Sequence, residues 1–348
     1  MGTFILLLDG AADDKIYQLG GKTPLEASRK PFIDNIASRG LLCSTDSKQY
    51  THAFLLEFLT GRNVEVPRGV IEALGLGLSL KDGEVVYRLS PAMIMDGEII
   101  EWCFNVPFRY RDKVVKDFIN ELTLKSKFNF RVYIYDKVGL RGLLVLKDQE
   151  VIDTPSPARD INVSIDSLDT IGKPIVNVAL RNNGLTLIPW GGGSLDKTIN
   201  LNSKIKPLTI VSRSPSVLGV ASLLRLKMVK GRYLSYDLLY ALKILKEHDN
   251  VLLHVEETDI ISHMRRPDLK VRLIEKIDSL LLNNADVLKG HKVLILVDHG
   301  TSSITGKHLE SKVPLAYATL EHHSDVTVRT FSESVDCYIP LNLLARVI

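Results

Sequence analysis

The stretch that decides the fold runs from Val251 to His263 and reads VLLHVEETDIISH. Its first five residues, Val251–Val255, form a short apolar run that passes directly into acidic residues, which is typical of a parallel strand buried on both faces. If the next segment is helical, Asp259 and His263 share one face, where a carboxylate and an imidazole can meet a single ion. The stretch therefore predicts a buried strand and then a helix, with two types of metal ligand just beyond the strand.

Two further apolar runs follow the same pattern. Phe4–Leu8 ends at Asp9, and Val293–Val297 ends at Asp298 and His299. Ligands of open α/β sheets bind beyond the carboxyl ends of the strands, so we expect all three runs to deliver these side chains to one edge. Segments with helical spacing lie between the runs, at Thr23–Gly40, Leu234–Leu245 and Leu269–Leu282. The predicted fold class is α/β, with a mostly parallel sheet flanked by helices.

These segments, together with His308 on a following loop, supply a set of candidate metal ligands. The set contains three aspartates and three histidines: Asp9, Asp259, His263, Asp298, His299 and His308. Mixed oxygen and nitrogen ligands favour Mn or Zn, with Mg or Co as alternatives. Two adjacent divalent ions can neutralise charge on the attacking and the leaving oxygen of a phosphoryl transfer. The alternative is that the aspartates cap helices and the histidines are ordinary core or surface residues.

The middle of the chain differs from the two ends in its pattern of predicted strands and helices. Strand-like runs at Glu98–Glu101, Phe130–Tyr135 and Gly142–Leu146 accompany one helical stretch, Lys113–Leu122. This mixture predicts an α+β cap domain at 93–184, inserted between two parts of the core at 1–92 and 185–348. We expect the apolar run Leu185–Pro189 to return to the main sheet.

Composition narrows the possible partners. The 348 residues include 44 Lys and Arg against 41 Asp and Glu, and this net charge of +3 is too small to indicate nucleic acid or an anionic membrane as the main partner. Three widely spaced cysteines argue against a disulfide framework and a CxxC zinc site. No apolar run is long enough to span a membrane, and the apolar start lacks the basic residues of a signal peptide. We expect a cytoplasmic protein, and no oligomeric state is predicted.

A resemblance to a known family becomes specific at this point. The chain resembles the archaeal type of cofactor-independent (2,3-bisphosphoglycerate-independent) phosphoglycerate mutase, within the alkaline-phosphatase-like metalloenzyme superfamily. The matching stretches occur in the family's order: Asp9–Asp14, Leu19–Ala27, Arg68–Gly77, Asp82–Arg88, His254–His263, Asp298-His299 and Lys307-His308. The resemblance implies an alkaline-phosphatase-like core with an inserted cap, and the interconversion of 3- and 2-phosphoglycerate, a small phosphorylated substrate, in glycolysis.

The resemblance also implies roles for individual residues. Asp259, His263 and His308 would hold one divalent ion, and Asp9, Asp298 and His299 would hold a second. Family members grip the substrate with arginines of the cap and with lysines before a core strand. The residues at these positions are Arg68, Arg88, Arg141, Lys204 and Lys206.

The chain departs from the family at the nucleophile. A serine in a Pro-Gly-Ser-Asp segment normally accepts the phosphoryl group from one hydroxyl and returns it to the neighbouring one. The corresponding region here, Ser47–Leu55, reads SKQYTHAFL, so the serine position falls on Gln49 or Tyr50. Tyr50 carries a phenol, and Thr51 is the nearest aliphatic hydroxyl; related superfamily members use threonine. Both residues are therefore catalytic candidates.

Two alternatives to a mutase follow from this departure. Without a covalent acceptor, a metal-bound water could still attack a phosphate ester, which would make the protein a metal-dependent phosphomonoesterase. A chain that keeps its metal ligands but turns over no substrate would instead be a metal-binding pseudoenzyme with a binding or regulatory role.

Overall fold

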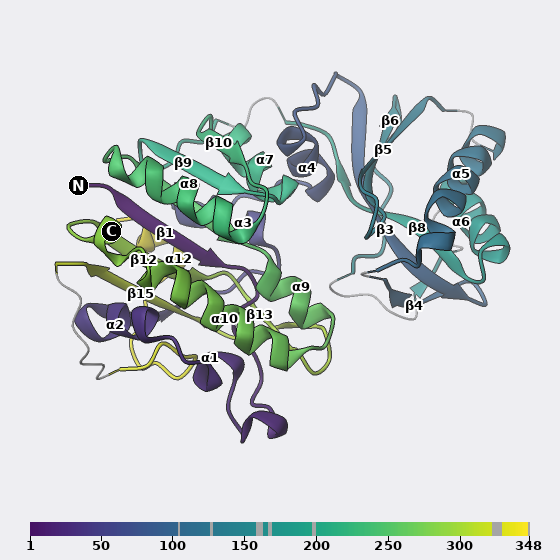
Figure 1. Ribbon diagram of the computed structural model, residues 1–348. Coiled ribbons are helices and arrows are strands. Elements are labelled where there is room, and N and C mark those ends of the chain that lie inside the picture. Colours follow the sequence, from purple (N-terminus) through teal and green to yellow (C-terminus); the bar gives the residue numbers. More distant parts are fainter. Residues whose placement is uncertain are drawn as a thin grey trace. The chain divides into compact units, whose positions relative to one another are not determined.

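The computed structural model describes residues 1–103, 105–125, 128–157, 163–165, 169–196, 200–321 and 329–346. They form two compact units (Figure 1). Unit 1 comprises Met1–Glu65 and Leu201–Ile348, and unit 2 comprises Val66–Asn200.

Unit 1 is built on a seven-stranded sheet in which only one strand runs against the others. The strands in spatial order are β10 (Lys227–Lys230), β9 (Leu208–Ser212), β11 (Asn250–Val255), β1 (Thr3–Leu8), β12 (Lys292–Val297), the reversed β15 (Val313–Thr319) and β2 (Leu41–Thr45). Leu8, at the end of β1, lies opposite Val255 of β11 and Val297 of β12. The predicted parallel sheet is confirmed, and its three predicted strands are neighbours that end level.

Helices cover both faces of this sheet. Figure 1 shows α8 (Leu234–Lys246) and α10 (Pro267–Leu282) on the near face and α3 (Thr51–Thr60) behind the sheet. The remaining elements of unit 1 are η1 (Tyr17–Leu19), α1 (Pro24–Ala27), α2 (Pro31–Arg39), α7 (Pro215–Leu223), α9 (Glu257–His263), α11 (Ala285–Leu288), α12 (Leu341–Leu344) and the small β13 (Gly300–Thr301) and β14 (His308–Leu309). The single helix predicted at Thr23–Gly40 is two helices, α1 and α2, because Lys30 is kept out of the helical region by Pro31.

Unit 2 is an α+β unit with an antiparallel sheet. Its strands are β5 (Phe130–Asp136), β6 (Arg141–Lys147), β3 (Glu84–Met95), β4 (Glu98–Trp102) and β7 (Val163–Ser164), with β8 (Leu185–Gly193) also paired to β3. The helices are α4 (Arg68–Gly75), α5 (Phe108–Lys125) and α6 (Asp169–Arg181), of which α5 and α6 pack together.

The pairing of β8 corrects one prediction. Leu185–Pro189 does not return to the main sheet, because β8 pairs antiparallel with β3 from Met93 and Leu185 onward. An apolar run identifies a buried strand but not the sheet that receives it. Since α4 and β3 belong to the same unit as β8, unit 2 extends beyond the predicted insertion 93–184 at both ends.

The cysteines correct a second prediction. Cys43 on β2 and Cys337 form a disulfide across a sequence separation of 294 residues, and Cys103 is the free cysteine. Backbone hydrogen bonds run beside the disulfide, from Ser44 N–H to the Cys337 carbonyl and from Ile339 N–H to the Ser44 carbonyl. Only the fold brings the two sulfurs together, so the spacing of the cysteines could not indicate the pair.

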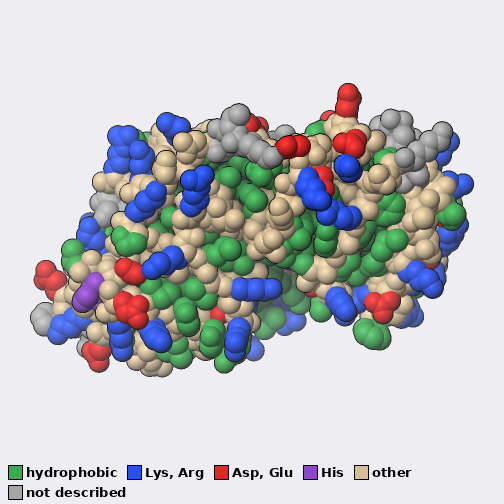
Figure 2. All heavy atoms as spheres, turned by 90° about the horizontal axis from the view of Figure 1, so that it is seen from above, with side chains coloured by type: hydrophobic (Ala, Val, Ile, Leu, Met, Phe, Trp, Pro, Cys, Tyr) green, Lys and Arg blue, Asp and Glu red, His purple; other side chains and the backbone are tan. Residues whose placement is uncertain are grey.

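The surface agrees with the small net charge. On the face seen in Figure 2, Lys and Arg side chains are scattered and interspersed with Asp and Glu. Among the described residues, no helix combines the length and the apolar character that crossing a membrane requires.

Asp278 on α10 provides a pH-dependent test of how α10 packs on α2. Its Oδ1 accepts a hydrogen bond from the Ile33 N–H at 2.8 Å, and burial raises the pKa of Asp278 to about 6. The folded protein therefore keeps a proton that the unfolded chain has already lost, so the free energy of unfolding should fall as pH rises from about 4 to about 6. Asp278→Asn keeps an acceptor but cannot ionise, and should remove on the order of 2 kcal/mol of this fall. Urea unfolding of both proteins across this pH range is the measurement, and parallel pH profiles would contradict the prediction.

Candidate metal centre

The candidate ligands meet where β1, β11 and β12 end. Because Leu8, Val255 and Val297 are level, the residues that follow them are brought to one edge of the sheet. Asp9 is tied to this edge by a hydrogen bond from its N–H to the Val255 carbonyl at 3.0 Å. The predicted convergence of strand ends is therefore what the structure has.

Asp259, His263 and His308 form the first group, with ligand atoms all within 4.8 Å of one another. Nε2 of His263 lies 3.2 Å from one oxygen of Asp259, and Nε2 of His308 lies 3.8 Å from the other. The Nδ1 atoms of the two histidines lie 2.7 Å and 2.9 Å from the carbonyl oxygens of Gly306 and Gln49. A carbonyl only accepts, so Nδ1 carries a proton in both rings, and each Nε2 faces the carboxylate. Two Nε2 atoms and a carboxylate that converge in this way form a donor set that fits a divalent cation.

His299 is the centre of the second group. Its Nε2 lies 3.1 Å from Oδ1 of Asp9 and 3.5 Å from Oδ2 of Asp298. Thr301 donates its hydroxyl to Asp259 at 2.7 Å and lies 3.1 Å from Nδ1 of His299, so the Thr301 oxygen accepts from Nδ1–H. Nε2 of His299 therefore points at two carboxylates, whereas in the first group two Nε2 atoms face one carboxylate. Asp259 also belongs to this second group with Asp9 and His299, so one carboxylate borders both positions.

The carboxylates of the second group are short of donors. Oδ1 of Asp298 accepts from the N–H groups of Gly10 and His299, both at 3.0 Å. Oδ1 of Asp9 and Oδ2 of Asp298 are buried, and each has Nε2 of His299 as its neighbour, at 3.1 Å and 3.5 Å. Two buried carboxylates that share one imidazole are costly unless a further cation balances their charge. This donor set fits divalent metal ions.

The protonation equilibria show the same concentration of charge. Burial, together with the neighbouring Asp9 carboxylate, raises the pKa of Asp298 to about 7. Burial alone would lower the pKa of His299, but Asp298 and Asp9 raise it to about 10. Burial and the nearby His299 lower the pKa of His308 to about 4. In the absence of a metal, protonated His299 therefore supplies positive charge beside the carboxylates of Asp9 and Asp298.

A buried serine and histidine support Asp9, and neither was predicted as a site residue. Nε2 of His254 lies 3.0 Å from Oδ2 of Asp9, and Nδ1 of His254 lies 3.0 Å from the hydroxyl of Ser212. All three side chains are almost completely buried, and Ser212 and His254 come from the neighbouring strands β9 and β11. A histidine inside the otherwise apolar run Val251–Val255 was the available signal.

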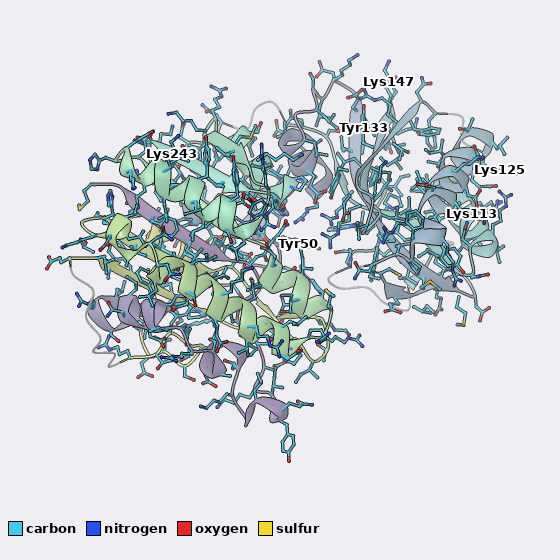
Figure 3. All side chains as sticks on the ribbon, in the orientation of Figure 1. Tyr50, Lys113, Lys125, Tyr133, Lys147 and Lys243 are labelled. Atoms are coloured by element: carbon cyan, nitrogen blue, oxygen red, sulfur yellow. A yellow bond between two sulfur atoms is a disulfide. The ribbon has the colours of Figure 1, made fainter. Side chains whose placement is uncertain are left out.

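The two catalytic candidates lie at the start of α3, which Tyr50 precedes. The hydroxyl of Thr51, the first residue of α3, is buried and donates to Oδ2 of Asp9 at 3.3 Å. Tyr50, labelled in Figure 3, is partly exposed and its ring stacks on His52. The Thr51 hydroxyl thus contacts the second group at the positive end of the α3 dipole.

The predicted substrate-binding residues are divided between the units. In unit 2, Arg68 and Arg88 both pair with one carboxylate, Glu72, which also accepts from the Tyr135 hydroxyl at 2.6 Å. Burial raises the pKa of Glu72, but the two guanidinium groups outweigh it and hold the pKa at about 2. Arg141 of unit 2 lies 3.8 Å from Asp136. In unit 1, Lys204 and Lys206 are exposed, and Nζ of Lys206 donates to Asn202.

Comparisons with known proteins agree with this fold. Residues 235–334 match a family model described as the metalloenzyme superfamily, and this range holds five of the six candidate ligands. Residues 61–180 match the model for 2,3-bisphosphoglycerate-independent phosphoglycerate mutase. The mutase of that name from Picrophilus torridus is 24% identical, over 95% of this chain and 91% of its own length.

Solved structures show the same fold. A protein from Pyrococcus horikoshii superposes with a TM-score of 0.69 at 19% identity, covering 99% of this chain and 96% of its own. The cofactor-independent phosphoglycerate mutase from Thermoplasma acidophilum has a TM-score of 0.57 at 19% identity, covering 100% and 99%.

Over residues 235–334 the chain is similar to the metalloenzyme superfamily, and this similarity implies divalent metal ions. Along almost its whole length it is similar to archaeal cofactor-independent phosphoglycerate mutases. The resemblance drawn from the sequence motifs is confirmed.

Asp298→Asn tests two opposing effects on stability. Repulsion between the clustered carboxylates destabilises the folded protein, and a bound ion stabilises it. Without added metal, the variant should be more stable than the wild type near neutral pH, by about 1 kcal/mol, because a charge beside Asp9 is removed while an acceptor for the Gly10 N–H remains. With saturating Mn²⁺ the order should reverse, since an ion stabilises only the state that binds it. Thermal unfolding of both proteins with and without Mn²⁺ measures the effect. Equal Mn²⁺-induced shifts in the two proteins would contradict it.

Proposed function

We propose that the protein is a divalent-metal-dependent phosphoryl-transfer enzyme that interconverts 3- and 2-phosphoglycerate, with Thr51 as the covalent acceptor. One observation carries the proposal: the buried Thr51 hydroxyl donates to Asp9, within a group of carboxylates and histidines that fits divalent cations. The similar proteins are phosphoglycerate mutases, which supports a small phosphate monoester as the substrate class. The activity would belong to glycolysis in the cytoplasm.

The two ligand groups would each hold one ion, Mn or Zn by the chemistry of the donors. Asp259, His263 and His308 would bind the first. Asp9, Asp298 and His299 would bind the second, with Asp259 at the border of both. When bound, the ions supply Lewis acidity, which lowers the pKa of a coordinated hydroxyl and neutralises charge on phosphoryl oxygens.

The residues of the chain account for the covalent step. The Thr51 oxygen forms a bond to phosphorus while the bond between phosphorus and the C3 oxygen of the substrate breaks. The proton that Thr51 gives up ends on that C3 oxygen, so charge and atoms balance and phosphothreonine remains. The return step uses the C2 hydroxyl in the same way and restores Thr51. The hydrogen bond to Asp9 orients the Thr51 hydroxyl, and the chain Ser212–His254–Asp9 orients Asp9 in turn.

In unit 2, Arg68, Arg88 and Arg141 remain the proposed partners of the substrate's phosphate and carboxylate, since guanidinium forks suit both groups. Glu72 fixes the first two in place through its ion pairs, which holds their planar groups in one orientation before a substrate arrives. Lys204 and Lys206 are the proposed cations of unit 1.

The proposal is tested by Thr51→Ala, Thr51→Ser and, as a control, Tyr50→Phe. With Mn²⁺, Thr51→Ala should lower phosphoglycerate interconversion by at least about a thousandfold, because the acceptor is lost. Thr51→Ser and Tyr50→Phe should keep activity, and mass spectrometry of quenched wild type should find phosphate on Thr51. Phosphate release is assayed beside interconversion.

Each other outcome has a defined meaning. Interconversion that survives Thr51→Ala but is lost in Tyr50→Phe would assign the acceptor to Tyr50. Phosphate release without interconversion would make the protein a phosphomonoesterase. No turnover at full metal occupancy would make it a pseudoenzyme.

A further inference from the structure

Lys270 on α10 is a buried lysine that contacts the loops of the metal centre. Its side chain is completely buried, and Nζ lies 2.8 Å from Oδ2 of Asp13, 3.0 Å from the Thr301 carbonyl and 3.2 Å from the Ala12 carbonyl. An ammonium group has three protons to donate, and all three have acceptors here. Burying a charged ammonium group costs free energy, and well-placed acceptors offset that cost.

The three acceptors belong to the two loops that carry candidate ligands. Ala12 and Asp13 follow Asp9 after β1, and Thr301 follows Asp298 and His299 after β12. The loops are also joined directly, because the Thr301 N–H donates to the Ala12 carbonyl at 2.9 Å. Lys270 therefore binds this junction from the side of α10.

The junction leads straight to the ligands. The hydroxyl of Thr301 contacts both Asp259 and His299, while the carbonyl of the same residue accepts from Lys270. Asp13 is itself held by the N–H and hydroxyl of Ser303 and, through its own N–H, by Glu333. A shift of the Thr301 backbone would move a hydroxyl that orients one ligand from each group.

We propose that Lys270 is a positioning residue of the metal centre. By clamping the loops after β1 and β12, it sets the geometry in which Asp9, Asp259 and His299 meet a divalent cation, and so sets the affinity for that cation. The identity of the ligand rests on the proposed function, whereas the clamping of the loops does not.

Lys30 provides a matched control. It is also almost completely buried, and its Nζ donates to the Leu25 carbonyl at 2.6 Å and pairs with Asp34 at 3.2 Å. Neither partner is a candidate ligand or follows one in its loop. Lys30→Met therefore removes a buried ammonium of the same kind without releasing the loops of the centre.

The experiment compares Lys270→Met with Lys30→Met in the full chain. Mn²⁺ affinity is measured by calorimetric titration, and amide hydrogen exchange is measured on the metal-free proteins. Lys270→Met should weaken Mn²⁺ binding at least about tenfold, the usual effect of removing an outer support of a metal site, while Lys30→Met stays within about twofold of wild type. Residues 9–14 and 298–303 should lose exchange protection in Lys270→Met only.

Asp13→Asn is the second variant, in case Lys270→Met does not fold. Asparagine has the shape of aspartate but no charge, so this variant weakens one of the three contacts of Lys270. It should therefore weaken Mn²⁺ binding by a smaller factor than Lys270→Met. Wild-type affinity in the folded Lys270 or Asp13 variant, or an equal loss in Lys30→Met, would overturn the inference. A wild type that binds no Mn²⁺ would refute the proposed function, and the exchange data would then decide on Lys270 alone.

Discussion

Three carboxylates gathered at one edge of a parallel sheet are the constraint on which the rest of the structure depends. The strands that precede Asp9 and Asp298 are buried and apolar, and burial of apolar surface fixes their register whatever follows them. The register then forces acidic side chains together, with Asp259 added from α9. Hydrophobic burial therefore holds the three carboxylates close together. Hydrogen-bond donors and a bound cation offset the repulsion between them. The donors include the N–H groups of Gly10 and His299 and the hydroxyl of Thr301.

The contacts around the centre set the direction in which each ligand atom points. Backbone carbonyls accept from Nδ1 of His263 and of His308, and the Thr301 hydroxyl does the same for His299. The three rings thereby present Nε2 inward. On the other side, His254 and Ser212 fix one oxygen of Asp9, which leaves the second oxygen facing His299. An arrangement prepared in this way needs little rearrangement to bind metal, which is what phosphoryl transfer requires of a site that acts by charge and placement.

The parts of this centre that the sequence could predict are those with a local signature. An apolar run that ends in Asp9 or Asp298, and a pair spaced like Asp259 and His263, can be found from neighbouring residues alone. The partners of Lys270 and of Cys43 lie 31 to 294 residues away along the chain, so no local pattern indicates them. The pairing of β8 with β3 could not be predicted for a related reason, because hydrophobicity indicates that a strand is buried but not which strand it pairs with. At the start of α3 the serine of the family motif is replaced, so the sequence left both Tyr50 and Thr51 as candidates for the nucleophile. The hydrogen bond from the Thr51 hydroxyl to Asp9 favours Thr51.

The central claim is that the gathered aspartates and histidines hold two divalent ions. It is tested most directly by a crystal structure of the protein grown with Mn²⁺, with anomalous data collected at the manganese edge. We expect two anomalous peaks, one bound by Asp259, His263 and His308 and the other by Asp9, Asp298 and His299, each with ligand distances typical of Mn²⁺. Fully occupied Mn²⁺ elsewhere on the protein, with these six side chains making no contact to it, would contradict the claim.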